Sequence, residues 1–261
     1  MPPIDIPAGR PSAPHGVCGA IPARWGSTRL PGKALVDLGG RPMIEHVWRR
    51  ASSAPSLDRV VVLTDDERIA TAARGFGAEA EMTPADCASG TDRIAWAARR
   101  WDCRAVVNIQ GDEPLIDPQG IERIARHLLA HPEDPIVTLA ADAEPGDLDD
   151  PNVVKVVLDR AGRALYFSRA GIPHPRGGPL AAPLRHLGIY GYQLGALLEL
   201  AELEPTPLER TESLEQLRAL EHGFAIRVLT GARFSRGVDT AADAAAVASQ
   251  LASFSDLGGN R

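Results

Sequence analysis

The sequence has few cysteines, no long apolar run and no excess of positive charge. Its three cysteines, Cys18, Cys87 and Cys103, are far apart and form no Cys-x-x-Cys pair, which argues against a disulfide framework or a cysteine metal site. No stretch approaches the roughly 20 apolar residues of a membrane-spanning helix. The net charge of −6 argues against binding nucleic acid along a basic face. We therefore expect a cytoplasmic protein without membrane insertion and without a nucleic-acid partner.

The composition is that of a folded globular protein. Hydrophobic residues make up 44% and charged residues 24% of the 261 residues, which are ordinary values for this class. Residues 1–15 are rich in proline and are predicted to form a disordered extension. Residues 16–254 are predicted to form a single domain with an antiparallel insertion at about 152–193, and residues 255–261 are predicted to form a frayed tail.

The apolar pattern of the first half predicts an α/β fold. Continuous apolar runs at 17–21, 59–64, 105–110 and 136–140 are typical of buried parallel strands, and 79–82 can form a shorter strand. Helical patterns alternate with these runs, and Thr91 can cap one of the helices. The alternation predicts a Rossmann-like, mostly parallel sheet with helices on both faces.

The second half has a different pattern. Two short strands flanking a polar turn are predicted to form an antiparallel β-hairpin. Further strands and helices follow, and Asp239 can cap a last helix. The predicted hairpin strands are 153–158 and 164–168, the later strands are 186–192 and 224–229, and the helices are 194–203 and 211–222.

The loop from Ile21 to Lys33 directly follows the first predicted strand. It contains two glycines, two hydroxyl side chains and three cations, Arg24, Arg29 and Lys33. Backbone N–H groups and cations of such a loop can surround a polyphosphate, and ligands of open α/β sheets bind at this end of a strand. The loop lacks the Walker A spacing, and no Gly-x-Gly-x-x-Gly follows the strand, which argues against a dinucleotide oxidoreductase.

Two isolated aspartates are candidates for a metal site. Asp112 follows a buried strand in the segment 110–114, Gln-Gly-Asp-Glu-Pro, and Asp239 lies in the segment 237–240, Gly-Val-Asp-Thr. Mg²⁺ prefers carboxylate oxygens, and polyphosphate sites usually hold it through one or two carboxylates together with phosphate oxygens. Helix capping or a plain turn is the alternative interpretation of both aspartates.

Three other stretches carry polar groups that suit a ligand, and each has an ordinary structural alternative. Residues 89–93 place hydroxyls, a glycine and a cation at a predicted helix start, which suits a nucleotide but also simple capping. His186 and Tyr190 share one face of a predicted strand, where they could bind a hydroxyl-rich ligand or face solvent. Glu215 and Gln216 would ordinarily be solvated on an amphipathic helix.

Taken in this order, the motifs resemble the 3-deoxy-manno-octulosonate cytidylyltransferase family. The matching segments are Ile21–Lys33, Gln110–Pro114, Tyr166–Ala170, Arg185–Tyr192, Leu214–Arg218 and Gly237–Thr240. The resemblance implies a nucleotide-diphospho-sugar transferase fold and a homodimer formed through the antiparallel insertion. It also implies that CTP reacts with the sugar acid 3-deoxy-D-manno-octulosonate (Kdo), in the presence of Mg²⁺, to give CMP-Kdo and pyrophosphate for lipopolysaccharide synthesis.

The resemblance further implies roles for individual residues. The nucleotide would be bound by Pro22, Ala23, Arg24, Ser27, Lys33, Arg93 and Gln110. The sugar acid would be surrounded by Gln110, Arg169, His186, Tyr190, Glu215 and Gln216, with Arg169 facing its carboxylate. Asp112 and Asp239 would hold Mg²⁺, and together with Arg24 and Lys33 they would carry catalysis.

Two alternatives stay open at this point. The segment 173–184 is short and rich in proline and glycine, which leaves another 2-keto sugar acid or a phosphonate as an alternative acceptor. A non-catalytic nucleotide-binding protein is the alternative from another class. The presence of Lys33 together with Asp112 and Asp239 argues against that second alternative.

Overall fold

The computed structural model describes residues 15–26, 30–178 and 182–258. The extension predicted over residues 1–15 therefore lies outside the described residues, apart from His15, which begins the first strand. Ser27 also lies outside them. Within the described residues, none of the helices has the length and apolar character that a membrane span requires.

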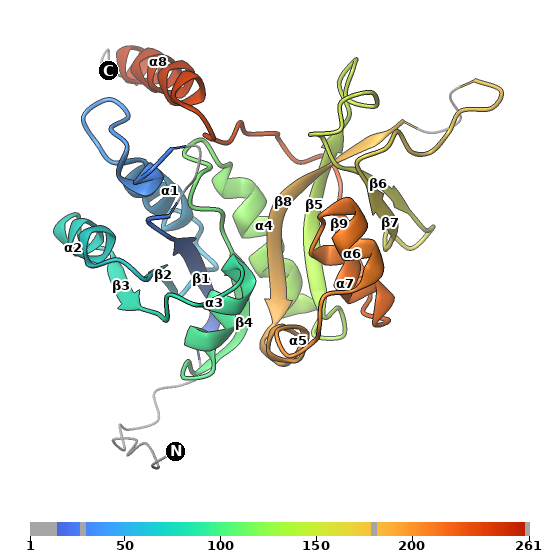
Figure 1. Ribbon diagram of the computed structural model, residues 1–261, viewed down its shortest axis with the longest axis horizontal. Coiled ribbons are helices and arrows are strands. Elements are labelled where there is room, and N and C mark those ends of the chain that lie inside the picture. Colours follow the sequence, from blue (N-terminus) through green and yellow to red (C-terminus); the bar gives the residue numbers. More distant parts are fainter. Residues whose placement is uncertain (1–14, 27–29, 179–181, 259–261) are drawn as a thin grey trace.

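The strands are β1 (His15–Ala23), β2 (Arg59–Thr64), β3 (Glu79–Met82), β4 (Cys103–Asn108), β5 (Ile136–Asp142), β6 (Lys155–Leu158), β7 (Ala164–Ser168), β8 (Leu184–Gln193) and β9 (Ile226–Leu229). The α-helices are α1 (Met43–Ala51), α2 (Glu67–Gly75), α3 (Gly90–Ala98), α4 (Pro118–Ala130), α5 (Leu194–Leu200), α6 (Pro207–Glu212), α7 (Gln216–Glu221) and α8 (Ala241–Gly258), with a 3₁₀ helix at Lys33–Leu35. The chain thus alternates strands and helices up to β5, as the sequence predicts (Figure 1).

The described strands form one mixed sheet in the order β3-β2-β1-β4-β8-β5-β9. The pairs β1–β2, β1–β4, β2–β3 and β5–β9 are parallel. β8 is antiparallel to both β4 and β5 and lies between them, while the β6–β7 hairpin is attached through β6. The antiparallel segment is therefore not a peripheral addition, because one of its strands joins the two halves of the sheet.

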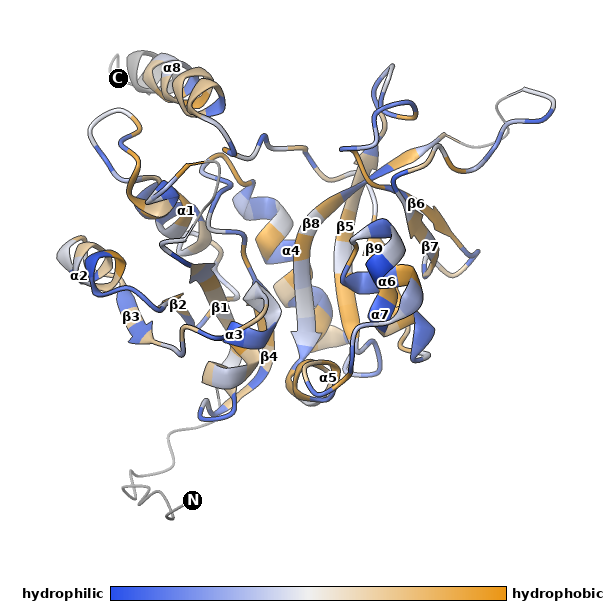
Figure 2. Ribbon diagram, viewed as in Figure 1, coloured by the Kyte–Doolittle hydropathy of each residue, from blue (hydrophilic) through white to orange (hydrophobic). Residues whose placement is uncertain are grey.

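Apolar side chains fill both faces of the sheet. On one face, α1, α2 and α4 cover β1, β2 and β4 with residues such as Val47, Ile69 and Ile124. On the other face, α3, α5 and α7 contribute Ile94 and Leu197 among others. In Figure 2, strands such as β1, β4 and β5 are coloured largely as hydrophobic, whereas helices such as α1 and α4 alternate between hydrophobic and hydrophilic residues. Because both faces of these strands are buried, their sequences are continuous apolar runs.

A third, smaller cluster joins α8 to the segment before α1. Val238 and Val247 pack with Leu38 and Met43, so the last helix lies beside the loop that follows Lys33 (Figure 1). α8 continues to Gly258, past residue 255, where the sequence predicts the frayed tail to begin.

Two predicted helix caps are wrong. Ser89, not Thr91, caps α3, since its side chain accepts from the backbone N–H of Asp92 in a reciprocal capping box. Thr240, not Asp239, makes the reciprocal side-chain and backbone bonds with Asp243 at the start of α8. In both cases the hydroxyl residue three positions before an aspartate completes a box that satisfies two backbone N–H groups.

The helix predicted over 211–222 is also wrong, because the structure contains two shorter helices there. α6 ends at Glu212 and α7 begins at Gln216. Between them Ser213 adopts a left-handed conformation with φ 52°, which stops the helical hydrogen bonds. α6 buries none of its residues, whereas α7 buries Leu217 and Ala219, so an apolar periodicity drawn across both helices could not locate the break.

Candidate active site

The carboxyl ends of β1 and β4 bring the predicted nucleotide residues together. Pro22 and Ala23 end β1, and Gln110 and Asp112 lie in the loop after β4, its parallel neighbour. Gly111 is required in that loop, because a Cβ there would lie 2.8 Å from the carbonyl oxygen of Pro22. The glycine in the Gln-Gly-Asp-Glu-Pro segment is therefore explained by the close approach of this loop to the backbone of β1.

Lys33 lies between the two candidate metal ligands. Its ammonium is 2.6 Å from Oδ2 of Asp112 and 3.1 Å from Oδ1 of Asp239. The backbone N–H of Val238 donates to the carbonyl oxygen of Asp112 at 2.8 Å, which places Asp239 beside the β4 loop. Burial works to lower the pKa of Lys33, but the attraction and hydrogen bonds of the two carboxylates outweigh it and raise that pKa. The ammonium therefore stays charged.

The base of the loop that begins at Arg24 is closed by Trp25 and Gly32. The N–H of Gly32 donates to the carbonyl oxygen of Trp25 at 3.2 Å. Gly32 has φ 68°, and a Cβ there would come within 2.9 Å of the Trp25 ring. The guanidinium of Arg68 lies 3.3 Å from the centre of the same ring. Glycine at position 32 is thus required both by its φ and by the packed indole.

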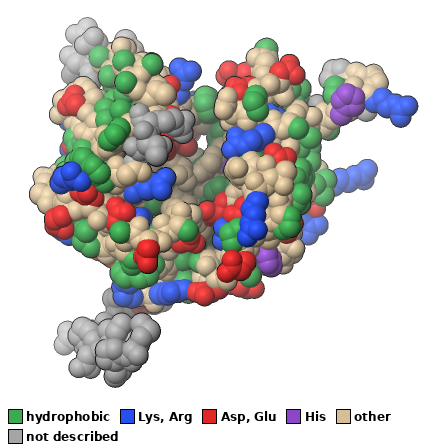
Figure 3. Space-filling view, in the orientation of Figure 1, with side chains coloured by type: hydrophobic (Ala, Val, Ile, Leu, Met, Phe, Trp, Pro, Cys, Tyr) green, Lys and Arg blue, Asp and Glu red, His purple; other side chains and the backbone are tan. Residues whose placement is uncertain are grey.

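A cavity of about 370 Å³ lies over this sheet edge. Of the predicted nucleotide and metal residues, it is lined by Pro22, Ala23, Arg24, Lys33, Arg93, Gln110, Asp112 and Asp239. Figure 3 shows the surface hollowed between the two halves of the molecule. Arg93 is only 3% exposed, and its guanidinium donates to Asp65 Oδ2 at 2.9 Å and to the carbonyl oxygen of Pro84 at 3.2 Å. Arg93 thus supports the wall of the cavity.

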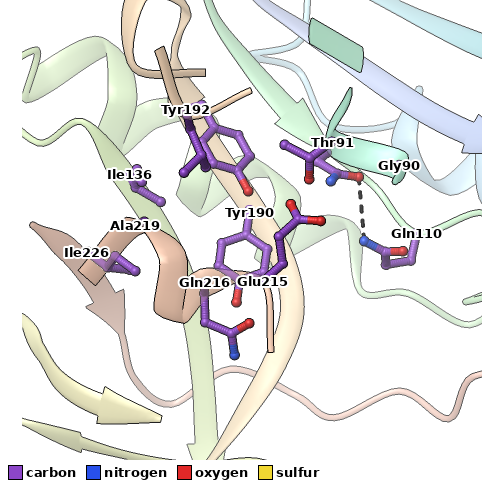
Figure 4. A pocket seen from close by; sticks show the side chains of 12 residues that line it. Gly90, Thr91, Gln110, Ile136, Tyr190, Tyr192, Glu215, Gln216, Ala219 and Ile226 are labelled. Atoms are coloured by element: carbon purple, nitrogen blue, oxygen red, sulfur yellow. Dashed lines mark hydrogen bonds between the residues drawn. The ribbon is translucent and has the colours of Figure 1, made fainter. Parts of the chain in front are cut away.

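A second cavity of about 180 Å³ adjoins the first, and Gly90 and Gln110 line both. Figure 4 shows Tyr190, Tyr192 and Glu215 at its centre. Its polar side is formed by Gly90, Thr91, Asn108, Gln110, Glu215 and Gln216, and its apolar side by Ile136, Leu200, Ala219 and Ile226. Glu215 and Gln216, which a helical pattern would leave solvated, thus line a cavity, because the break before α7 turns them inward.

Two side chains in this second cavity have unusual surroundings. The hydroxyl of Tyr190 is buried without a hydrogen-bond partner among the described residues. Burial raises the pKa of Glu215, against hydrogen bonds with Thr91 and Ser89 that lower it. A buried hydroxyl without a partner carries an energetic cost, which a bound polar ligand can relieve.

Two predicted sugar-acid residues do not line either of these cavities. The guanidinium of Arg169 donates to the carbonyl oxygens of Glu212 at 2.7 Å and Pro151 at 3.0 Å. His186 lies beside Tyr190, with ring centres 5.3 Å apart, and its Nε2 is 3.0 Å from Oγ1 of Thr138. Burial lowers the pKa of His186 to about 3, so this ring is neutral.

Sequence reasoning missed Asn108. This residue ends β4 and is only 3% exposed, yet it lines the second cavity. Thr91 and Ser89, from the helix start that the sequence analysis considers suited to a nucleotide, line the second and the first cavity, and Ser89 also caps α3. The available signal was a polar amide at the end of an otherwise apolar strand, which is unusual for a buried position.

The two carboxylates fit a divalent cation chemically. Asp112 and Asp239 already converge on one positive charge, the Lys33 ammonium, from segments 127 positions apart in the sequence. Two carboxylates with an adjoining cavity leave positions for phosphate oxygens and water, as Mg²⁺ sites on polyphosphates usually do. Among the described residues, no group of three or more His, Cys, Asp or Glu side chains could hold a metal ion by itself.

The chain is similar to known proteins over most of its length. The family model described as Cytidylyltransferase matches residues 19–227. A 3-deoxy-manno-octulosonate cytidylyltransferase of Syntrophobacter fumaroxidans is 53% identical over 242 residues, covering 90% of this chain and 97% of the relative. This chain belongs to the 3-deoxy-manno-octulosonate cytidylyltransferase family. The relative of the same description from Syntrophotalea carbinolica is 50% identical over 245 residues, covering 90% of this chain and 98% of that protein.

Solved structures support the assignment of the chain to this family. The structure of CMP:2-keto-3-deoxy-manno-octonic acid synthetase complexed with CTP is 40% identical, has a TM-score of 0.89, and covers 91% of this chain and 99% of that one. A cytidylyltransferase from Leptospira borgpetersenii has a TM-score of 0.59 at 18% identity, over 94% of this chain and 97% of that one, which shows the fold alone. The predicted nucleotidyltransferase fold and the prediction of an enzyme are confirmed.

Proposed function

We propose that this protein joins CMP from CTP to the anomeric hydroxyl of Kdo, giving CMP-Kdo and pyrophosphate for lipopolysaccharide synthesis. The observation that carries the proposal is the pair of joined cavities. One contains cations and two carboxylates, and the other contains hydroxyl and amide groups with Gln110 at the junction. A nucleotide in the first and a sugar acid in the second would meet at Gln110. The family relatives carry this activity in their names.

The residues have distinct tasks in this reaction. The anomeric oxygen attacks the α-phosphorus, the bond to the β-phosphate oxygen breaks, and the hydroxyl proton passes to solvent as pyrophosphate leaves. Arg24 and Lys33 would stabilise the negative charge on the triphosphate, and the backbone of Pro22 and Ala23 would lie beside the base. Positioning and charge stabilisation supply most of the rate enhancement in phosphoryl transfer.

We also propose that Mg²⁺ is bound by Asp112 and Asp239. The convergence of both carboxylates on the Lys33 ammonium supports this assignment. When bound, Mg²⁺ would neutralise charge on the phosphate oxygens as bonds change. Lys33 would then pair with phosphate oxygens in place of the carboxylates.

Tyr190 and its neighbours would bind the sugar acid. The unpartnered hydroxyl of Tyr190 and the side chains of Gln110, Glu215 and Gln216 can exchange hydrogen bonds with sugar hydroxyls. Neither Arg169 nor His186 lines this cavity.

A pyrophosphate-release assay tests the proposed reaction. With CTP and Mg²⁺, Kdo should support release, and other 2-keto sugar acids and phosphonates should support it less. Asp112→Asn should lower kcat by roughly 100-fold or more, as loss of a charge-stabilising group does. Asp102→Asn, which removes an exposed carboxylate elsewhere, should keep the wild-type rate. No release with Kdo but rapid release with another acid would reassign the acceptor.

The homodimer and the cytoplasmic location are further proposals. The β6–β7 hairpin leaves Leu165 63% exposed, which suits an apolar contact with a second copy. Light scattering coupled to size exclusion should give twice the monomer mass, and Leu165→Asp should shift the protein toward the monomer. A monomer mass for the wild-type protein would contradict the dimer. Fractionation of the producing cells would test the location.

A further inference from the structure

The connection between β9 and α8, residues 230–240, carries Asp239 from one half of the molecule to the other. It contains no helix or strand, and in Figure 1 it runs from the half that contains β5 and β9 to α8. The side chains of Arg233, Phe234 and Arg236 are exposed along it. Ordering such a segment costs conformational entropy, so it needs specific bonds to hold one conformation. The position of Asp239 therefore depends on where this connection is bonded to the rest of the protein.

The first half of the connection is bonded to β5 and β8. The backbone N–H of Ala232 donates to the carbonyl oxygen of Ala140 in β5 at 3.2 Å. The guanidinium of Arg185, in β8, lies 3.7 Å from the centre of the Phe234 ring. Both contacts come before residue 235, so the stretch that leads into Asp239 must be held by other groups.

Two successive residues of the loop after β4 hold this remaining stretch. The hydroxyl of Ser235 donates to Oε2 of Glu113 at 2.9 Å, and the backbone N–H of Val238 donates to the carbonyl oxygen of Asp112 at 2.8 Å. Between these bonds, a Cβ on Gly237 would lie 3.6 Å from that carbonyl oxygen and 3.9 Å from Cγ of Glu113. The connection thus packs directly against the loop that contains the first candidate metal ligand.

Glu113 differs from its neighbour Asp112 in the cavity that it lines. Asp112 lines the cavity assigned to the nucleotide, and Glu113 does not. Glu113 instead lines a separate cavity of about 70 Å³, together with Ser235 and Ile116. Its carboxylate is therefore directed to the connection, whereas the carboxylate of Asp112 is directed to Lys33.

We propose that Glu113 is a positioning residue, which holds residues 235–239 against the β4 loop through its bond with Ser235. The bond keeps the carboxylate of Asp239 beside that of Asp112, where both can bind one Mg²⁺. This inference rests on the proposed function and its Mg²⁺ site, and deepens them by assigning part of the metal affinity to a residue that does not contact the metal.

Calorimetric titration of Mg²⁺ in the absence of CTP tests this role. Glu113→Ala and Ser235→Ala should each weaken Mg²⁺ binding by roughly 5–30-fold, because loss of the bond releases the segment that carries Asp239. The double variant should bind no more weakly than either single one, since both changes remove the same bond. Glu113→Gln, whose amide oxygen can still accept from Ser235, should stay within about threefold of the wild type.

A second pair of serine and glutamate provides the matched control. The hydroxyl of Ser56 donates to Oε1 of Glu122 at 2.8 Å, and neither residue lines any of the three cavities. Ser56→Ala should therefore leave Mg²⁺ binding unchanged. A metal ligand at position 113 would give a different pattern, in which Glu113→Gln weakens binding as much as Glu113→Ala and Ser235→Ala binds like the wild type. That pattern would overturn the proposal.

Hydrogen–deuterium exchange measures the effect of the same bond without metal or substrate. Glu113→Ala and Ser235→Ala should speed exchange in residues 235–240, where the amide of Val238 is bonded to the β4 loop, and Ser56→Ala should not. If the wild type fails to turn over Kdo while the binding and exchange changes appear, the proposed acceptor is wrong and the positioning role stands. Wild-type Mg²⁺ affinity or wild-type exchange in both variants would refute the positioning role, whatever the acceptor.

Discussion

Lys33 occupies the position between two carboxylates where a divalent cation is proposed, so Lys33→Met should have two opposite effects. In the absence of nucleotide, the ammonium competes with Mg²⁺ for Asp112 and Asp239, and its removal should strengthen metal binding. In the presence of CTP, the same change removes a positive charge from the triphosphate and should weaken catalysis. A residue with a purely structural role would not produce these opposite signs.

The distances set the size of the first effect. At 2.6 and 3.1 Å, each ion pair is worth about 1–2 kcal/mol by Coulomb's law in water-like surroundings, and exposed pairs are usually worth less. Because the Asp239 side chain is 48% exposed, we take about 1–2 kcal/mol for both pairs together. Mg²⁺ should therefore bind the Lys33→Met variant roughly 5–30-fold more tightly than the wild type.

Calorimetric titration of Mg²⁺ without CTP measures this affinity, and pyrophosphate release measures the second effect. We expect kcat/KM for CTP to fall about 10²–10³-fold, the usual cost of removing one charge-stabilising donor. Arg74→Met, which removes an exposed cation paired with Glu67, should change neither quantity. Unchanged or weaker Mg²⁺ binding in Lys33→Met would refute the shared-site reasoning.

Two further predictions concern the acceptor side. Tyr190→Phe removes a buried hydroxyl without a described partner, so it should leave the free energy of unfolding unchanged or raise it by up to about 1 kcal/mol, while KM for the acceptor rises roughly three- to tenfold; a clear loss of stability in urea unfolding would contradict this. The pKa of His186 is lowered by burial to about 3, from an ordinary value of 6.5. The unfolded chain therefore takes up a proton at this residue between pH 6.5 and 3 that the folded protein does not. The contribution of His186 to the free energy of unfolding should therefore fall as the pH falls, by about 1.4 kcal/mol per pH unit below 6.5. His186→Phe should remove that part of the slope in urea unfolding measured from pH 7 to pH 4, and an unchanged slope would show that this ring titrates normally.

The alternation of buried strands with helices was predictable because burial on both faces makes parallel strands continuously apolar. The parallel register of β1 and β4 then brings Pro22 and Asp112 to one edge, which is why reasoning from strand ends placed the polyphosphate loop and the first carboxylate together. The local sequence was sufficient for this prediction, because a loop that follows a buried parallel strand lies at the carboxyl edge of the sheet.

The helix break was not predictable in this way. Ser213 has an ordinary sequence context, and its left-handed conformation accompanies hydrogen bonds from Arg169, 44 positions away. Likewise, the cap at Thr240 leaves Asp239 directed toward Lys33, a contact across 206 positions. Each of these features depends on partners that only folding brings close.

By itself, then, the sequence determined the layered α/β fold and the cation-rich loop at the end of the first strand. These follow from hydrophobic periodicity and from the fixed direction of parallel strands. The tertiary structure alone decided which polar groups line the acceptor cavity. Glu215, Gln216 and Asn108 are there because a broken helix and an antiparallel strand converge, whereas Arg169 is bonded to backbone carbonyls outside it. The physical reason is that a side chain's surroundings are set by long-range packing, which periodicity does not encode.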